Sequence, residues 1–394
     1  MKNTLLIIVS LGVLISNICA QSDYKTLHQQ SLVVDTHSDV LLQVLRGADI
    51  SRRLDYGHVD LIRLKEGGVD VQFFAVWPNP TLYGKGGMFK QSIRMINLLD
   101  KIIENNPDKI SLTRTPAEIE QTVKNMKIAV CIGVEGGTAI ENDLNKLKEL
   151  YDRGARYLGL TWNDSPDWAS CAKDESSPEY KGHRGLTEFG REVIHWMNDK
   201  GMIIDVSHSG EKTFWDVMEE SKKPIIASHS CVYNLCAHYR NLSDDQIKAI
   251  GKNRGVIFIN FYPGYLVNGF NRKYYALRKS SQAYMDSIKQ VYGNDRLGYR
   301  KYRNNYLVER TKDFRPDIER IVDHMDYIIS LIGDDHIGLG SDFDGISIVP
   351  RGIDDVSKMP EITRVMLEKG YSTERIEKIL GGNFMRVFRE VSAL

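Results

Sequence analysis

The feature that most limits the fold of this chain is a series of short apolar runs, separated by longer amphipathic stretches, between Ser31 and Gly345. The runs are LVVDTH, VDVQFFAVW, IAVCIGVE, RYLGLTW, MIIDVSH, PIIASH, GVIFINF and HIGLGSDFDG. They are almost continuously apolar, which is typical of parallel strands buried on both faces. Eight such strands predict an α/β fold, a closed (β/α)8 TIM-like barrel, with an open doubly wound sheet as the alternative.

The stretches between the runs have the pattern of amphipathic helices. LTEFGREVIHWMNDKG places Phe189, Val193 and Met197 on one face, with Thr187 near its start and Gly201 at its end. Helices that alternate with buried strands indicate right-handed βαβ crossovers. The sequence therefore predicts an outer ring of helices around the strands.

The chain of 394 residues is within the size range of one large barrel. We expect a single catalytic domain over residues 21–394, with a C-terminal extension at about 350–394. A tract at about 262–312, between the seventh and eighth strands, is rich in Tyr, Lys and Arg. It predicts a helical insertion over the active-site face, because a structureless loop of that length is uncommon. Its charges are most simply explained as a solvated surface.

Residues 1–20 have the pattern of a secretory signal peptide. Lys2 precedes the apolar run LLIIVSLGVLI, and a small-residue ending predicts cleavage before Gln21. The run is too short for a transmembrane span, and no second such segment follows. Ile18 before Cys19 fits a lipid-anchoring site poorly. We therefore expect export to a periplasmic or extracellular location, in soluble form rather than with a lipid anchor.

Charge and cysteine content exclude several classes of protein. Lys plus Arg and Asp plus Glu each number 52, and the isoelectric point is near 7.1, which argues against nucleic acid as a partner. Four cysteines remain after the signal peptide, and none forms a CxxC pair. They predict buried thiols with at most one or two bridges rather than a disulfide scaffold.

Five of the eight runs end in residues that can bind a metal ion. In a parallel barrel the carboxyl ends of all strands open onto one face, so side chains from distant parts of the sequence converge there. The active site is therefore expected at the strand C-terminal ends. Its candidate residues are His37, Asp39, Glu135, His208, His229 and Asp342.

Imidazole and carboxylate donors without thiolates suit zinc or a similar divalent ion. Three His and two carboxylates are too many for one catalytic zinc that keeps an open position, so they predict two Zn²⁺ per chain. Glu135 is the expected bridge, with His37 and Asp39 on one ion and His208 and His229 on the other. A water shared by both ions would lose a proton at a pKa of roughly 7 and give a hydroxide aimed at a carbonyl.

The motifs, taken in order, resemble those of the membrane (renal-type) dipeptidase family, zinc metallopeptidases among the amidohydrolase-like metal-dependent barrels. The resemblance extends from about Ser31 to Phe388 and includes VVDTHSD, GVEGG, GLTEFGREVIHWMNDKGMIIDVSHSG, PIIASHS, HYRNLSDDQI and HIGLGSDFDG. It implies the same five metal ligands, with Glu135 also counted as catalytic. It also implies that Arg240 binds the free carboxylate of the substrate, and that Asp342 relays a proton to the leaving amine.

One position departs from the family pattern. Renal-type members carry a histidine directly after LT at the end of the fourth strand, where it binds substrate and stabilises the tetrahedral intermediate, and here that residue is Trp162. An indole N–H donates one hydrogen bond but cannot become a cation. Asn163 could supply part of the donor function. Tyr262, after the seventh strand, is a further candidate for substrate contact, with a packed tyrosine as the alternative.

The resemblance predicts a metal-dependent dipeptidase whose partners are small peptides with a free C-terminal carboxylate, with a D-residue tolerated at that end, and the signal peptide predicts that it is exported. The first alternative is a dinuclear zinc hydrolase of another small amide or of N-acyl amino acids. The second is a non-catalytic metal-binding protein. A homodimer is compatible with the sequence, which leaves the oligomeric state open.

Overall fold

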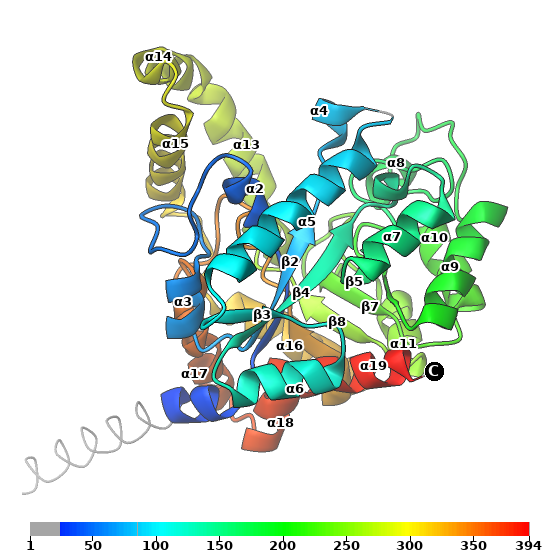
Figure 1. Cartoon of the computed structure of the whole chain (residues 1–394). Helices are drawn as coiled ribbons and strands as arrows, with labels where there is room; N and C mark the ends of the chain where they lie inside the picture. Colours follow the sequence, from blue (N-terminus) through cyan, green and yellow to red (C-terminus); the bar gives the residue numbers. More distant parts are fainter. Residues whose placement is uncertain (1–23, 85, 394) are drawn as a thin grey trace, which may run out of the picture.

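The computed structural model describes residues 24–84 and 86–393, and the predicted signal peptide lies outside the described residues (Figure 1). Eight parallel strands form the predicted barrel, and the pairing of β2 with β4 closes it, so the open-sheet alternative is wrong. The strands are β1 (Val34–Ser38), β2 (Val71–Val76), β4 (Ile128–Glu135), β5 (Ala155–Gly159), β6 (Ile203–Asp205), β7 (Ile226–Ser230), β8 (Val256–Ile259) and β9 (Ile337–Leu339).

A ninth strand, β3 (Ile110–Leu112), was not predicted from the sequence. It pairs in parallel with residues 128–130 at the start of β4, on the side where β5 pairs with β4 only from Ile132 onward. Three residues are too few to give a periodic pattern, so the sequence carried no clear signal for this strand.

All residues of the eight barrel strands are buried, which explains their continuous apolar runs. Side chains that point into the barrel form one cluster with Phe384 and Phe388 of α19 (Asn383–Ser392). Phe384 packs edge-on against Phe73 at a ring distance of 5.2 Å. The C-terminal extension therefore closes the end of the barrel at which the strands begin, and leaves the opposite end for the site.

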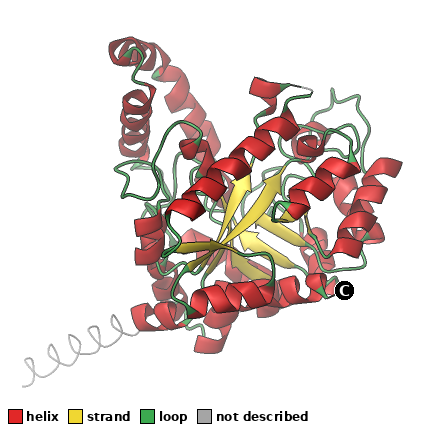
Figure 2. Cartoon of the chain, in the orientation of Figure 1, coloured by secondary structure: helices red, strands yellow, loops and turns green. Residues whose placement is uncertain are grey.

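Helices surround the strands (Figure 2). The predicted helix α9 (Glu188–Lys200) is confirmed, with the Thr187 hydroxyl accepting from Gly190 N–H and Gly201 ending the helix in the left-handed region. Further helices outside the insertion include α2 (Leu41–Val44), α3 (Leu61–Glu66), α4 (Pro80–Tyr83), α5 (Met88–Asn105), α6 (Pro116–Lys124), α7 (Leu144–Asp152), α8 (Ala172–Glu175), α10 (Glu211–Glu220), α11 (Asp244–Lys252), α16 (Glu319–Ile332), α17 (Pro360–Glu368) and α18 (Thr373–Glu377).

The tract predicted as a helical insertion forms an arm that rises beside the open end of the barrel (Figure 1). Its helices are α12 (Pro263–Leu266), α13 (Phe270–Ser280), α14 (Gln282–Tyr292) and α15 (Arg296–Thr311). A small apolar cluster of Phe270, Tyr274 and Leu307 packs against Ile348 in the loop after β9. This packing fixes the base of the arm next to the strand ends.

The structure bears on the predictions made for the cysteines and for membrane-spanning segments. The four cysteines of the described residues are buried and free, as the predicted packing of apolar thiols requires. Among the same residues, no helix is both long and apolar enough to span a membrane.

Candidate active site

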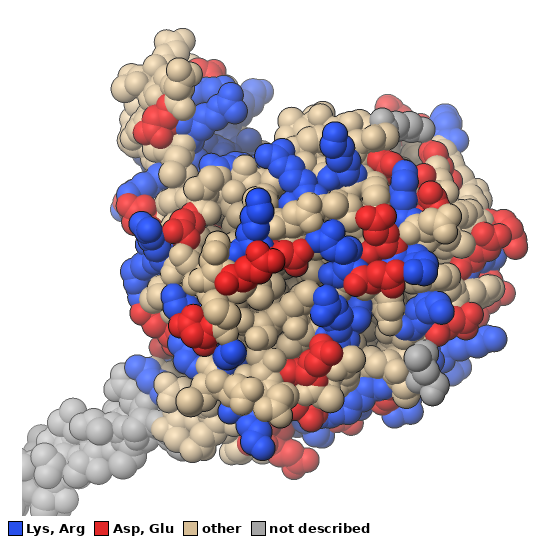
Figure 3. Space-filling view, viewed as in Figure 1, with Lys and Arg blue, Asp and Glu red and all other residues tan. Residues whose placement is uncertain are grey.

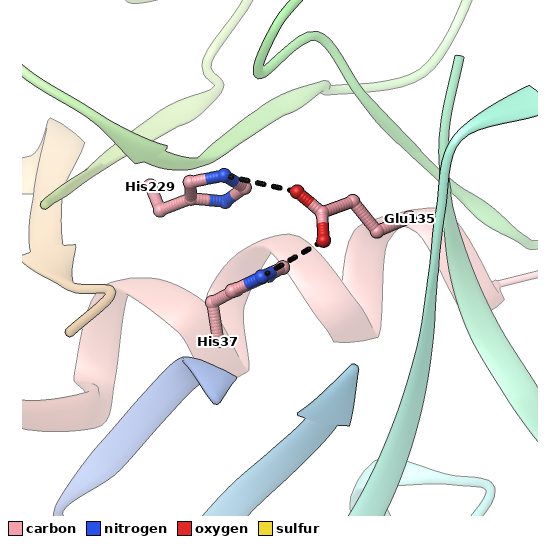
Figure 4. A group of neighbouring side chains, drawn as sticks. All are labelled: His37, Glu135 and His229. Atoms are coloured by element: carbon pink, nitrogen blue, oxygen red, sulfur yellow. Dashed lines mark ion pairs between the residues drawn. The ribbon is translucent and has the colours of Figure 1, made fainter. Parts of the chain in front are cut away.

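The residues predicted as metal ligands converge where the barrel strands end. His37 lies in β1, Glu135 ends β4, and His229 lies in β7; all three are buried and point toward one another (Figure 4). His208 and Asp342 follow β6 and β9 and adopt left-handed φ angles of 66° and 60°. Non-glycine residues rarely adopt this conformation, and it is concentrated at functional sites.

Glu135 lies at the centre of this group. Its Oε2 is 3.5 Å from His37 Nε2. Its Oε1 is 3.1 Å from His208 Nε2 and 3.5 Å from His229 Nε2. Asp39 Oδ2 lies on the other side of His37 Nε2, at 3.6 Å. One carboxylate therefore stands between two sets of imidazole nitrogens.

Hydrogen bonds fix which nitrogen of His37 carries its proton. His37 Nδ1 is 2.9 Å from the Tyr157 hydroxyl, and that hydroxyl donates its own proton to Thr36 O at 3.1 Å. The Tyr157 oxygen must therefore accept from His37 Nδ1–H. When the imidazole is neutral, as a metal ligand must be, His37 Nε2 therefore presents a bare lone pair to Glu135 and Asp39.

The same reasoning applies to the other two histidines. His229 Nδ1 is 2.8 Å from Ser228 Oγ, whose proton goes to Asp205 at 2.6 Å, so His229 donates through Nδ1. His208 Nδ1 donates to Asn163 Oδ1 at 3.1 Å. Both Nε2 atoms are consequently bare, although they lie only 3.0 Å apart.

Three bare nitrogens around a carboxylate fit a cation. Their lone pairs would repel one another and Glu135 unless positive charge lay between them. His37 Nε2 and Asp39 Oδ1 are buried without a hydrogen-bond partner in the described part of the chain. The donor atoms of His37, Glu135 and His229, and likewise those of His37, Asp39 and Asp342, lie within 4.8 Å of one another. Nδ1 atoms held by other side chains are typical of metal-binding histidines.

The ionisation states of the acidic residues differ across the site. Burial raises the pKa of Asp342 to about 8, with a further contribution from the negative charges of Asp39 and Glu135. Burial would also raise the pKa of Glu135, but without a metal the positive charge of a protonated His37 holds it well below its usual range. Without a metal, Asp342 is therefore protonated at neutral pH beside an ionised Glu135, a separation typical of acid and base roles.

A cavity of about 290 Å³ opens above these carboxylates and is lined by Asp39, Glu135, Asp342 and Arg240. Arg240 is buried, donates to His229 O at 3.2 Å and lies 5.6 Å from the Tyr265 ring. Among the described residues its Nε has no hydrogen-bond partner. Arg240 is thus a buried guanidinium rather than a member of a surface ion pair.

The other predicted substrate residues occupy different places. Trp162 lines the cavity and packs against Trp77 at a ring distance of 4.6 Å. Asn163 also lines the cavity, but its Oδ1 is engaged by His208, so it positions an imidazole, a role that the sequence did not suggest. Tyr262 lies in the cavity wall with its hydroxyl donating to Asn271 at 2.9 Å.

Several residues that support the site were not singled out from the sequence. They include Tyr157, Ser228 and Asp205, which fix the histidine orientations, and Asn260, which donates to Asp342 at 2.9 Å. For Asp205 a signal was available, because VVDTH and IIDVSH both place an aspartate shortly before the histidine. Whether the remaining residues face the site depends on how their strands are oriented, and the apolar runs alone do not show that.

Comparisons with known proteins agree with this geometry. Residues 21–394 match the family described as Membrane dipeptidase (Peptidase family M19). The chain is 31% identical to the uncharacterized dipeptidase C965.12 of Schizosaccharomyces pombe, over 94% of this chain and 83% of that protein. It is 32% identical to the dipeptidase tcpJ of Claviceps purpurea, over 85% of this chain and 69% of that protein.

Solved structures show the same architecture. The probable dipeptidase PvdM from Pseudomonas aeruginosa has a TM-score of 0.78 at 25% identity, over 95% of this chain and 98% of that chain. A metallo peptidase from Rhodobacter sphaeroides, liganded with a phosphinate mimic of the dipeptide L-Ala-D-Ala, has a TM-score of 0.73 at 25% identity, over 92% and 100% of the two chains. The chain belongs to the membrane dipeptidase family, peptidase family M19, and is a metallo-dipeptidase.

Proposed function

We propose that this metallo-dipeptidase uses two zinc ions to hydrolyse dipeptides that have a free C-terminal carboxylate. The observation that carries the proposal is the position of Glu135, one carboxylate oxygen of which faces His37 while the other faces His208 and His229. A carboxylate that faces two groups of bare imidazole nitrogens is suited to bridge two ions.

The residues that would hold the ions are divided by Glu135. His37 and Asp39 would bind one ion, and His208 and His229 the other, with Glu135 shared. When bound, divalent ions supply Lewis acidity that polarises a substrate carbonyl and lowers the pKa of water. Zinc is favoured because the donors are imidazole nitrogens and carboxylate oxygens in a buried site.

The side chains around the cavity then have separate tasks. Arg240 offers a guanidinium fork, with an unpartnered Nε, to the terminal carboxylate of the substrate. Asp342 accepts a proton and delivers it to the leaving amine, a task for which its raised pKa is suited. Trp77 and Trp162 form an apolar wall that excludes water from one side of the cavity.

The stereochemistry and location of the substrate form part of the same proposal. The Rhodobacter sphaeroides relative was solved with a mimic of L-Ala-D-Ala. A D-residue at the C-terminal position is therefore included among the proposed substrates. Export by the signal peptide at residues 1–20 would place the enzyme where such peptides from cell walls or diet occur.

A second candidate function is the hydrolysis of another small amide, such as an N-acyl amino acid. The observation that favours it is Trp162, which reshapes the cavity where the renal-type enzymes carry a histidine. A non-catalytic metal-binding protein is the third candidate, and rests on that same position.

One preparation of zinc-loaded protein would separate the three functions. It should be assayed against L-L dipeptides, L-D dipeptides and N-acyl amino acids, with Glu135→Ala as the inactive control. We expect release of both amino acids from dipeptides, and its loss in the variant and after chelation. Turnover of N-acyl amino acids alone would favour the second candidate, and binding without turnover the third.

A further inference from the structure

The arm that rises beside the active site is strongly basic. Between residues 262 and 312 it contains eleven Lys and Arg but only three Asp and Glu, although the whole chain has 52 of each kind. Figure 3 shows Lys and Arg side chains along the side of the arm that faces the barrel. The arm therefore carries a net positive charge next to the open end of the barrel, although Lys and Arg also occur over the rest of the surface.

Two arginines of the arm line the active-site cavity itself. Arg278 of α13 and Arg303 of α15 lie in the same cavity wall as Tyr274 and Tyr275. The Arg278 guanidinium lies 5.9 Å from the Tyr274 ring centre, and Tyr274 is buried in the cluster that fixes the arm. The arginines thus stand on a packed base and face the cavity that also contains the proposed metal ligands.

Neither arginine has an acidic partner in the part of the chain that the structure describes. No carboxylate oxygen of those residues lies within 4.0 Å of the Arg278 or Arg303 guanidinium, whereas Arg153, Arg191 and Arg315 each form such a pair. Arg303 is also half-buried, so part of its charge has lost contact with water. An unpaired cation in that environment favours binding of an anion.

Neighbouring cations make this region still more positive. Arg300, on the same helix as Arg303, donates to Gln43 Oε1 at 2.7 Å rather than to a carboxylate. Burial lowers the pKa of Arg300 to about 10, and the charges of Arg46 and Arg303 contribute to that shift. Like charges brought this close repel one another, and an anionic ligand would relieve the repulsion.

Arg278 and Arg303 are separate from Arg240, the residue proposed to bind the terminal carboxylate of the substrate. Arg240 follows β7 and lies against His229 and Tyr265, whereas Arg278 and Arg303 come from the arm. A neutral dipeptide has only one carboxylate, which Arg240 would satisfy. The second group of cations is explained by a substrate with a second carboxylate.

We propose that Arg278 and Arg303 form a specificity subsite for an acidic side chain of the substrate, so that the enzyme prefers dipeptides containing Asp or Glu. This inference rests on the proposed dipeptidase function. The chemistry recognised is a carboxylate, and it can belong to either residue of the dipeptide. The substrates Ala-Glu and Glu-Ala distinguish the two positions.

The test compares kcat/KM for Ala-Glu, Glu-Ala and Ala-Ala in the wild type and in the double variant R278Q/R303Q. We expect the wild type to favour one acidic dipeptide over Ala-Ala by about tenfold or more, since hydrogen bonds to a charged group carry that much selectivity. The double variant should lose most of this preference. Lys279→Gln, an exposed position on α13 outside the cavity lining, is the matched control and should keep it.

Two further measurements distinguish loss of the subsite from unfolding of the variant and from failure of the proposed dipeptidase function. Arg303→Glu should shift the preference toward Ala-Lys, which a variant that merely unfolds cannot do. Calorimetric binding of Ala-Glu and Ala-Ala to the zinc-loaded protein tests the subsite even without turnover. If no dipeptide is hydrolysed but Ala-Glu binds more tightly, the proposed function fails and the subsite stands. A wild type without acidic preference, or a double variant that slows Ala-Ala as much as Ala-Glu, would overturn the inference.

Discussion

Replacing Tyr157 with phenylalanine should weaken metal binding, although Tyr157 is not itself a proposed metal ligand. The Tyr157 hydroxyl accepts from His37 Nδ1–H at 2.9 Å and donates to Thr36 O at 3.1 Å, in a fully buried position. Phenylalanine keeps the ring, which stacks on Phe73 at 5.2 Å, and removes only the oxygen. His37 would then lose the hydrogen bond that fixes its tautomer and orientation.

The expected loss of stability in Tyr157→Phe follows from the two hydrogen bonds that the hydroxyl makes. Each buried group left without a partner costs about 1–3 kcal/mol, so the metal-free variant should lose about 2–6 kcal/mol of unfolding free energy, measured in urea. Loss of the orienting partner of a metal-binding histidine typically lowers metal affinity about 10–100-fold. Competition with a chromophoric chelator measures that affinity.

Tyr151→Phe is the matched control. The Tyr151 hydroxyl donates to Lys200 O at 2.7 Å on the protein surface, away from the site. It should cost less than about 1 kcal/mol and leave zinc affinity unchanged. If Tyr157→Phe loses stability but binds zinc as tightly as the wild type, the tautomer reasoning for His37 is refuted.

Three further predictions concern separate positions. Arg240→Met should raise KM for dipeptides by about 10–100-fold with a smaller effect on kcat, and equal losses in both would contradict carboxylate binding. Trp162→His should raise kcat for dipeptides, because an imidazolium stabilises an oxyanion better than an indole, and an unchanged kcat would contradict this role. His324 accepts from Val232 N–H and donates to Leu266 O, and burial lowers its pKa to about 4. The unfolded chain therefore protonates first as the pH falls below about 6.5, and up to about 3 kcal/mol of stability is lost toward pH 4. Urea unfolding should show that loss relative to His324→Gln, and a pH-independent difference would contradict it.

The sequence predicted the barrel because buried parallel strands have a simple pattern. Runs such as IAVCIGVE are apolar on both faces, and each of the eight became a strand. The three residues of β3 gave no such pattern, because that strand is short and pairs only with the start of β4, before β5 joins it. The six candidate residues at the strand ends converge as predicted, because a parallel barrel sends all its strand ends to one face.

The surrounding residues could not be predicted from the same patterns. Tyr157 lies within a strand, and its orientation toward His37 depends on the register of β5 against its neighbours. The sequence suggests Asn163 as an oxyanion donor, but the structure places its oxygen against His208. The sequence predicts only a solvated surface for the charges of the arm, since nothing local in it shows that Arg278 and Arg303 line the cavity.

Counting the metal ions tests the central claim most directly. Elemental analysis of the purified, zinc-loaded protein should give two zinc ions per chain in the wild type. Glu135→Gln, which keeps the shape of the side chain but removes its charge, should bind one or none and lose dipeptide hydrolysis. A single ion in the fully active wild type, or two ions with retained activity in Glu135→Gln, would contradict a site built around a bridging Glu135.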